Sequence, residues 1–220
     1  MEFVKWGKIA RLHREWEITE KVDGTNGVLW WTEWHEDIDF KQALTSVIVG
    51  NDPPRYLFAG SRNRWLTKDG DNYGFARWAW ENAYDLTVLG LGRHFGEWFG
   101  SGIQRRYGLD RKVFALFDTR WSDSIDDLPP GVDVVPVLGT IDGGYLNTAI
   151  QLALDELRLN GSFIVPGFMD PEGIVVRHKQ EGSRFKVLLV GDDAPKTAVE
   201  PPDLGPWDPD AFRASYGPDA

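Results

Sequence analysis

The 220-residue chain contains no cysteine. This excludes disulfide bonds, thiolate metal sites and a cysteine nucleophile. Its four histidines are scattered and show no spacing typical of zinc ligands. No apolar run reaches the roughly 18 residues needed to span a bilayer, and the N-terminus lacks the apolar core of a signal peptide. We therefore expect a soluble cytoplasmic protein that does not contact membranes.

The composition indicates one domain with a different C-terminal segment. The chain is 42% hydrophobic and 13% aromatic, which is enough for a sizeable core. Its net charge of -10 argues against a general nucleic-acid coat protein. Residues 191–220 contain six prolines and seven acidic side chains. We expect residues 1–190 to form the domain and residues 191–220 to form a loosely packed or disordered tail.

Periodicity predicts an α+β fold with antiparallel sheets and few helices. Alternating residues predict a strand over 16–22, a turn over 23–27 and a return strand over 28–34. Further strands are expected over residues 40–49, 55–59, 92–99, 113–118, 173–177 and 185–190, the last two as a hairpin. Helices are expected over residues 75–86 and 145–159, the second with one apolar face and a stop at Asn160-Gly161.

The stretch from Glu20 to Gly27 places Lys21 between two carboxylates and just before a turn. A lysine is normally protonated at neutral pH and cannot attack an electrophile. It becomes a nucleophile when it is desolvated or lies near other cations. The alternative is an ordinary solvated lysine on a strand. The choice depends on which later segments reach this position.

Four later segments carry side chains that suit nucleotide chemistry. Arg62, in Ser61-Arg62-Asn63-Arg64, could hold phosphate or ribose oxygens. Glu97 lies among aromatic residues, where a carboxylate needs a partner such as a ribose hydroxyl or a metal-bound water. Phe117 could stack on a base, and Glu172, at the start of a strand, could bind Mg²⁺.

Arg184 and Lys186 lie two residues apart and therefore on one face of a strand, where they could neutralise a phosphate and favour the neutral form of Lys21. Each of these four later segments, the last of which includes Arg184 and Lys186 with Glu172, also has an ordinary structural explanation. In order, these are surface arginines, a glutamate paired with an arginine, core packing, and a charged hairpin edge.

The order of these motifs resembles the covalent nucleotidyltransferases, which comprise ATP-dependent DNA and RNA ligases and mRNA capping enzymes. The motifs are Lys21-Val22-Asp23-Gly24, Gly96-Glu97, Phe117-Asp118, a run from Glu172 to Arg177, and a strand with Lys186. The run Lys21 to Asn26 resembles RNA ligases of the phage RNA ligase 2 and RNA-editing type, because DNA ligases usually have arginine where Asn26 stands. The form of the motif around Glu97 also resembles that of RNA ligases.

The resemblance implies an ATP-dependent RNA ligase, phage-encoded or cellular, that uses ATP and Mg²⁺ or Mn²⁺ to join an RNA 5′-phosphate to a 3′-hydroxyl. It implies that Lys21 forms a lysyl-AMP and that Lys186 contacts the α-phosphate. It further implies that Glu20 lies beside adenine, Phe117 stacks on it and Glu97 holds the ribose. Asn26 and Arg62 would lie near the sugar, phosphate or RNA ends, and Glu172 would bind the metal.

Two departures from the family pattern affect these expectations. Arg184 stands where the last motif usually has a lysine, and the 30 residues after Val190 are too few for a second domain. We therefore expect a minimal ligase or one that engages RNA with a partner chain. The alternatives are a small ATP-dependent DNA ligase, a non-catalytic nucleic-acid-binding module with this fold, or a nucleotidyltransferase acting on another acceptor.

Overall fold

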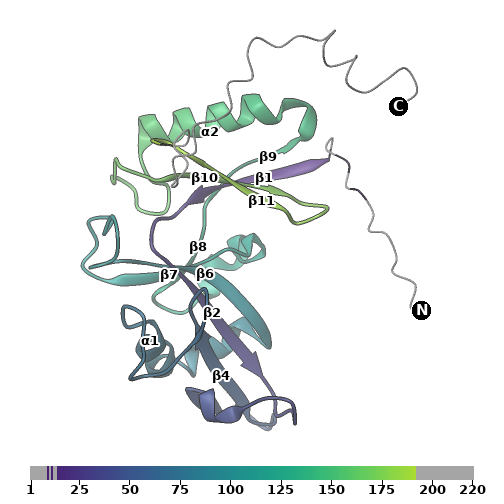
Figure 1. Cartoon of the computed structure of the whole chain (residues 1–220), viewed down its shortest axis with the longest axis vertical. Helices are drawn as coiled ribbons and strands as arrows, with labels where there is room; N and C mark the ends of the chain where they lie inside the picture. The colour runs from purple at the N-terminus through teal and green to yellow at the C-terminus, as the bar shows by residue number, and fades with distance from the viewer. Residues whose placement is uncertain (1–8, 10, 12–13, 192–220) are drawn as a thin grey trace, which may run out of the picture. The chain divides into compact units, whose positions relative to one another are not determined.

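The computed structural model describes residues 9, 11 and 14–191 (Figure 1). The tail predicted for residues 191–220 lies outside this range, apart from Gly191. The described chain forms two β-sheets, each packed against a helix. No helix in this part of the chain is long and apolar enough to cross a membrane.

The first sheet has the strand order β11-β10-β1-β9 and is antiparallel throughout. Its strands are β1 (Glu15–Lys21), β9 (Val137–Asp142), β10 (Gly173–His178) and β11 (Arg184–Leu188). Helix α2 (Leu146–Asn160) crosses one face of this sheet (Figure 1). Trp16 and Ile18 of β1 pack there against Ala153, Leu154 and Leu157. The predicted helix, its apolar face and the β10–β11 hairpin are therefore confirmed.

The second sheet has the order β3-β4-β2-β6-β7-β8, and β5 also pairs with β4. Its strands are β2 (Thr25–Thr32), β3 (Thr45–Val47), β4 (Arg55–Gly60), β5 (Trp65–Leu66), β6 (Gly92–Gly100), β7 (Lys112–Leu116) and β8 (Val132–Val134). All pairs are antiparallel except β7–β8. Helix α1 (Phe75–Glu81) packs against this sheet through buried Phe75, Ala76 and Ala79. The α+β prediction is confirmed.

The predicted hairpin between residues 16–22 and 28–34 is wrong. β1 and β2 belong to different sheets, so the chain passes from one sheet to the other through Val22, Asp23 and Gly24. β2 also begins earlier than predicted, at Thr25, which makes the turn shorter. Val22 is buried with Phe99 and the other residues of a small core beside this link. Because Val22 is buried there, the chain continues from β1 into the second sheet and does not turn back along β1.

Other elements are shorter than predicted, and some were missed. The strand predicted over residues 40–49 contains a 3₁₀ turn at Phe40–Gln42 and only the short strand β3. The helix predicted over residues 75–86 ends at Glu81, and a 3₁₀ helix follows at Asp85–Leu89. Strands β5, β8 and β9 were not predicted. The remaining 3₁₀ helices are Thr119–Asp127 and Gly143–Tyr145.

Candidate active site

A cavity of about 340 Å³ lies where the carboxyl end of β1 meets residues from both sheets. It is lined by almost all of the residues predicted for the site. These are Glu20, Lys21, Asn26, Arg62, Glu97, Phe117, Arg184 and Lys186. The remaining predicted residue, Glu172, reaches the group through Lys21. The fold therefore brings together side chains that are up to 166 positions apart in the sequence.

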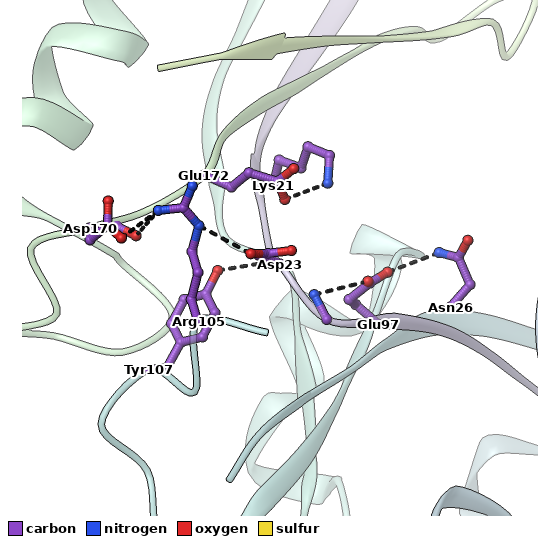
Figure 2. Close-up of polar contacts among 9 residues, drawn as sticks. Lys21, Asp23, Asn26, Glu97, Arg105, Tyr107, Asp170 and Glu172 are labelled. Carbon is purple, nitrogen blue, oxygen red and sulfur yellow. Dashed lines mark hydrogen bonds and ion pairs between the residues drawn. The ribbon is translucent and has the colours of Figure 1, made fainter. Parts of the chain in front are cut away.

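Lys21 is the last residue of β1 and is paired with Glu172. Its Nζ atom donates to Glu172 Oε2 at 2.5 Å (Figure 2). The exposed fractions of the two side chains are 23% and 18%, so the ion pair is partly shielded from solvent. Because Gly173 lies opposite Lys21 in the β1–β10 pair, Glu172 ends its loop beside the lysine. The sheet register thus explains why these two motifs meet.

Strand alternation separates Glu20 from Lys21. Trp16 and Ile18 face α2, and Glu20 has the same parity along the strand. Its carboxylate accepts hydrogen bonds from Ser162 Oγ at 2.6 Å and from the backbone N–H groups of residues 163 and 164 at 2.7 and 3.1 Å. Burial raises the pKa of Glu20 above its ordinary value, while these hydrogen bonds favour the ionised form. The carboxylate therefore anchors the loop after α2.

Glu97 and Asn26 lie directly opposite each other on β6 and β2. Asn26 Nδ2 donates to Glu97 Oε2 at 2.9 Å, and the backbone N–H of Gly24 donates to Glu97 Oε1 at 3.1 Å (Figure 2). Burial raises the pKa of Glu97 to about 7, although the charge of Lys21 and these two hydrogen bonds act in the opposite direction. Asn26 therefore positions the Glu97 carboxylate at the cavity.

Gly24 allows this contact because it has no side chain, and a larger residue would not fit at this position. A Cβ atom at Gly24 would lie 2.4 Å from the carbonyl oxygen of Trp98 and 2.8 Å from Phe99 Cβ. Contacts this short essentially never occur between real Cβ atoms and their neighbours. The glycine thus lets the link between the sheets approach β6 closely enough for its N–H to reach Glu97.

The first sheet presents a row of polar side chains to the cavity. The registers place Lys186 opposite Val175 and place Arg184 opposite Arg177. Arg177 in turn lies opposite Glu17 and is 3.5 Å from it across the β1–β10 pair. All five of these residues line the cavity. The predicted shared face of Arg184 and Lys186 is confirmed.

Phe117 and Arg62 lie at the borders of the cavity. Phe117 directly follows β7, is half-buried, and its backbone N–H donates to the carbonyl of Phe95. Arg62 follows β4, is exposed, and also lines a second cavity. The cavity therefore has an aromatic ring, a buried carboxylate and several cations on its walls.

A network below Lys21 holds the link between the sheets. The backbone N–H of Asp23 donates to the Tyr107 hydroxyl at 2.8 Å, and Arg105 Nε lies 3.1 Å from the Asp23 carboxylate (Figure 2). Arg105 also binds the Asp170 carboxylate at 2.5 Å. Burial raises the pKa of Tyr107 well above its ordinary value, so its hydroxyl remains protonated. Asp23 thus ties the residues after Lys21 to the β6–β7 loop, and Arg105 links that loop to the one that carries Asp170.

A family model described as RNA ligase matches residues 14–188, which is most of the chain. The chain belongs to the RNA ligase family. A comparison with curated proteins gave no match.

Solved structures from the RNA ligase family share the fold. A mutant of Naegleria gruberi RNA ligase with ATP and Mn is 20% identical, with a TM-score of 0.51 over 80% of this chain and 50% of that chain. A second mutant of that ligase, with AMP and Mn, is 19% identical with a TM-score of 0.50 and the same coverage. The chain thus spans about half the length of the solved structures that it matches.

Within this RNA ligase domain, sequence reasoning missed several residues that shape the site. They are Glu17, Arg105, Tyr107, Asp170 and Arg177. Period-two counting from Lys21 could have found Glu17, since both lie on the same strand face. Arg177 ends the run that begins at Glu172 but received no role, and the other three depend on pairings between distant segments, for which the sequence contains no local signal.

Proposed function

We propose that this protein is an ATP-dependent RNA ligase that forms a covalent lysyl-AMP intermediate on Lys21. One observation carries the proposal: in a chain of the RNA ligase family, Lys21, Glu97, Phe117 and Lys186 line a single cavity. The ATP- and AMP-containing structures of the Naegleria gruberi ligase support the choice of nucleotide.

The proposed reaction has three steps. Lys21 Nζ first releases the proton of its ion pair with Glu172 to solvent and then attacks the α-phosphorus of ATP as the neutral amine. A P–N bond forms, the bond from that phosphorus to the bridging oxygen breaks, and pyrophosphate leaves. The nitrogen then loses a proton to solvent. AMP passes from the lysine to an RNA 5′-phosphate, and an RNA 3′-hydroxyl displaces AMP to leave a phosphodiester bond. Nucleotidyl transfer of this kind depends on positioning and on cations that offset charge.

The cavity residues take the following roles in this proposal. Phe117 stacks on adenine and Glu97 accepts hydrogen bonds from the ribose. Lys186 contacts the α-phosphate, with Arg184 as a second cation on the same strand face. Asn26 positions Glu97, to which it is already bonded.

Two further residues complete the assignment. The Glu20 carboxylate is held by the loop after α2 and the backbone N–H of Glu20 donates to the carbonyl of Pro136, so we assign Glu20 a place beside adenine without a hydrogen bond from its side chain. Arg62, exposed at the border of the cavity, is assigned to the RNA ends.

The residues also fit a divalent metal that binds together with the nucleotide. Among the described residues, no group of three or more histidine or acidic side chains could hold a metal ion. Mg²⁺ in nucleotide sites commonly uses one or two carboxylates, with phosphates and water completing its ligands. We assign Glu172 as the protein ligand, where a bound Mg²⁺ or Mn²⁺ would offset the charge of the phosphates.

Covalent labelling tests the proposal. The protein is incubated with Mg²⁺ and α-labelled ATP, denatured and separated by electrophoresis. We expect label on the unaltered protein and on the control Lys41→Ala, which changes an exposed lysine of the 3₁₀ turn Phe40–Gln42 that does not line the cavity, and none on Lys21→Ala. Absence of an adduct, or an adduct that persists in Lys21→Ala, would refute the proposal.

A sealing assay tests the acceptor. Nicked duplexes are offered with an RNA or a DNA strand at the 3′-hydroxyl side, and we expect sealing of RNA. Preference for the DNA strand would favour a small DNA ligase. A partner chain that helps to engage RNA is part of this proposal, and efficient sealing by the purified chain alone would refute that part.

A further inference from the structure

A second cavity, also of about 340 Å³, adjoins the candidate active site. It is lined by Val28, Gly60, Ser61, Arg62, Asn63, Arg64, Trp65, Arg93 and Phe95. Arg62 lines both cavities. A ligand in the second cavity would therefore lie next to a nucleotide in the first.

The second cavity is positively charged on an acidic protein. Three arginines line it and no carboxylate does, although the chain carries a net charge of -10. None of the three forms an ion pair with another residue in the part of the chain that the structure describes. The Arg64 guanidinium donates to the backbone carbonyls of residues 70 and 71, which fix its position without neutralising it. These guanidinium groups suit a ligand with several negative charges.

Aromatic rings lie beside these cations on the same face of the second sheet. Phe95 has 54% of its surface exposed, which is unusual for a phenylalanine in a central strand. Arg93, two residues earlier on β6, lies 4.8 Å above the Trp30 ring, and Trp30 stacks on Trp65. Glu97 follows two residues after Phe95, so this face continues into the candidate active site.

An exposed ring beside arginines that form no ion pair among the described residues is the chemistry that recognises single-stranded nucleic acid. Phosphates bind the cations and bases stack on the rings, with little dependence on sequence. We propose that the second cavity binds the RNA strand that adjoins the adenylated site, with phosphates on Arg62 and Arg93 and a base on Phe95. This inference rests on the proposed ligase function. The phosphates and the base can belong to the strand that ends in the 5′-phosphate or to the strand that ends in the 3′-hydroxyl, and the binding experiment distinguishes the two.

Two substitutions and two matched controls test the inference on the full chain. Phe95→Ala removes the ring, and Tyr84→Ala removes an exposed ring that lies just before the 3₁₀ helix Asp85–Leu89 and does not line either cavity. Arg93→Gln removes one cation, and Arg77→Gln removes an exposed arginine of α1. All four positions are exposed, so the variants should fold, which circular dichroism would verify.

Binding is measured without ATP by fluorescence anisotropy, using two labelled oligoribonucleotides. One carries a 5′-phosphate and a blocked 3′ end, and the other carries 5′- and 3′-hydroxyl groups. We expect Phe95→Ala to weaken binding by about 5- to 150-fold. Arg93→Gln should make the plot of log binding constant against log salt concentration less steep by about one, as expected when one phosphate contact is lost. The oligonucleotide that shows the loss identifies the strand.

The result is distinguishable from failure of the ligase proposal. RNA binding with these losses but no lysyl-AMP adduct would refute the ligase and support the RNA surface. An adduct in the unaltered protein, combined with equal RNA binding by Phe95→Ala and Tyr84→Ala, overturns this inference. Undetectable binding of both oligonucleotides by the unaltered protein also overturns it.

Discussion

Glu97 should make the stability of this protein depend on pH. Burial raises the pKa of its carboxyl group from 4.5 to about 7 in the folded protein. The unfolded chain releases this proton near the ordinary value, so the folded state binds more protons between these two pH values. The free energy of unfolding should therefore fall as pH rises through this window. One pKa unit corresponds to about 1.4 kcal/mol, so the full penalty above pH 7 is about 3 kcal/mol.

Glu97→Gln tests this magnitude because glutamine is neutral at all relevant pH values. It can accept only one of the two hydrogen bonds that Asn26 and Gly24 donate, which costs about 1 kcal/mol at every pH. The free energy of unfolding of the variant, relative to that of the unaltered protein, should increase by about 2 kcal/mol from pH 5.5 to pH 8.5. Urea denaturation followed by tryptophan fluorescence would measure it, since the chain has eleven tryptophans.

The control is Glu36→Gln, which removes an exposed carboxylate. This variant should follow the same pH dependence as the unaltered protein. If the stabilities of Glu97→Gln and the unaltered protein differ by a constant amount across the pH range, the burial argument for Glu97 is wrong.

Two further predictions concern residues that hold the site together. Gly24→Ala should lower the free energy of unfolding by about 1–3 kcal/mol, because its Cβ meets the Trp98 carbonyl; Gly139→Ala, at a position with open space, should show no comparable loss in thermal denaturation. Ser162→Ala removes a hydrogen bond to the Glu20 carboxylate and should cost about 1.5–3 kcal/mol in urea denaturation. That loss should shrink at low pH as the carboxyl is protonated, and an equal loss in the exposed-site control Ser46→Ala would contradict it.

The sequence predicted elements whose residues carry their own periodic signal. The alternation of residues 16–22 and the apolar stripe of α2 each reflect burial of one face of one segment. The partners of a strand are not encoded in its own alternation. This is why residues 28–34 were wrongly placed as the return strand of β1, when residues 28–32 belong to β2 and pair with β4 and β6 in the other sheet.

The candidate site was predictable as a set of residues, and its internal contacts were not. Short motifs pointed to Lys21, Glu97 and Glu172 individually. The bond from Asn26 to Glu97 requires the β2–β6 register, which joins positions 71 residues apart. The Arg105 bridge depends on how a loop between two strands folds back on Asp23. Contacts of this kind follow from the packed sheets rather than from any one stretch.

The placement of Lys21 can be understood from its two neighbours on the chain. On one side, Glu20 is bonded to Ser162, 142 positions away, and on the other, Asp23 is bonded to Arg105, 82 positions away. Both anchors immobilise backbone that would otherwise be free at the end of a strand. An attacking group that is held in place before the reaction loses less entropy when it reacts. Strand alternation thus turns Glu20 away from the cavity to fix the backbone before Lys21, and Asp23 fixes the link that follows β1, while the side chain of Lys21 faces the cavity.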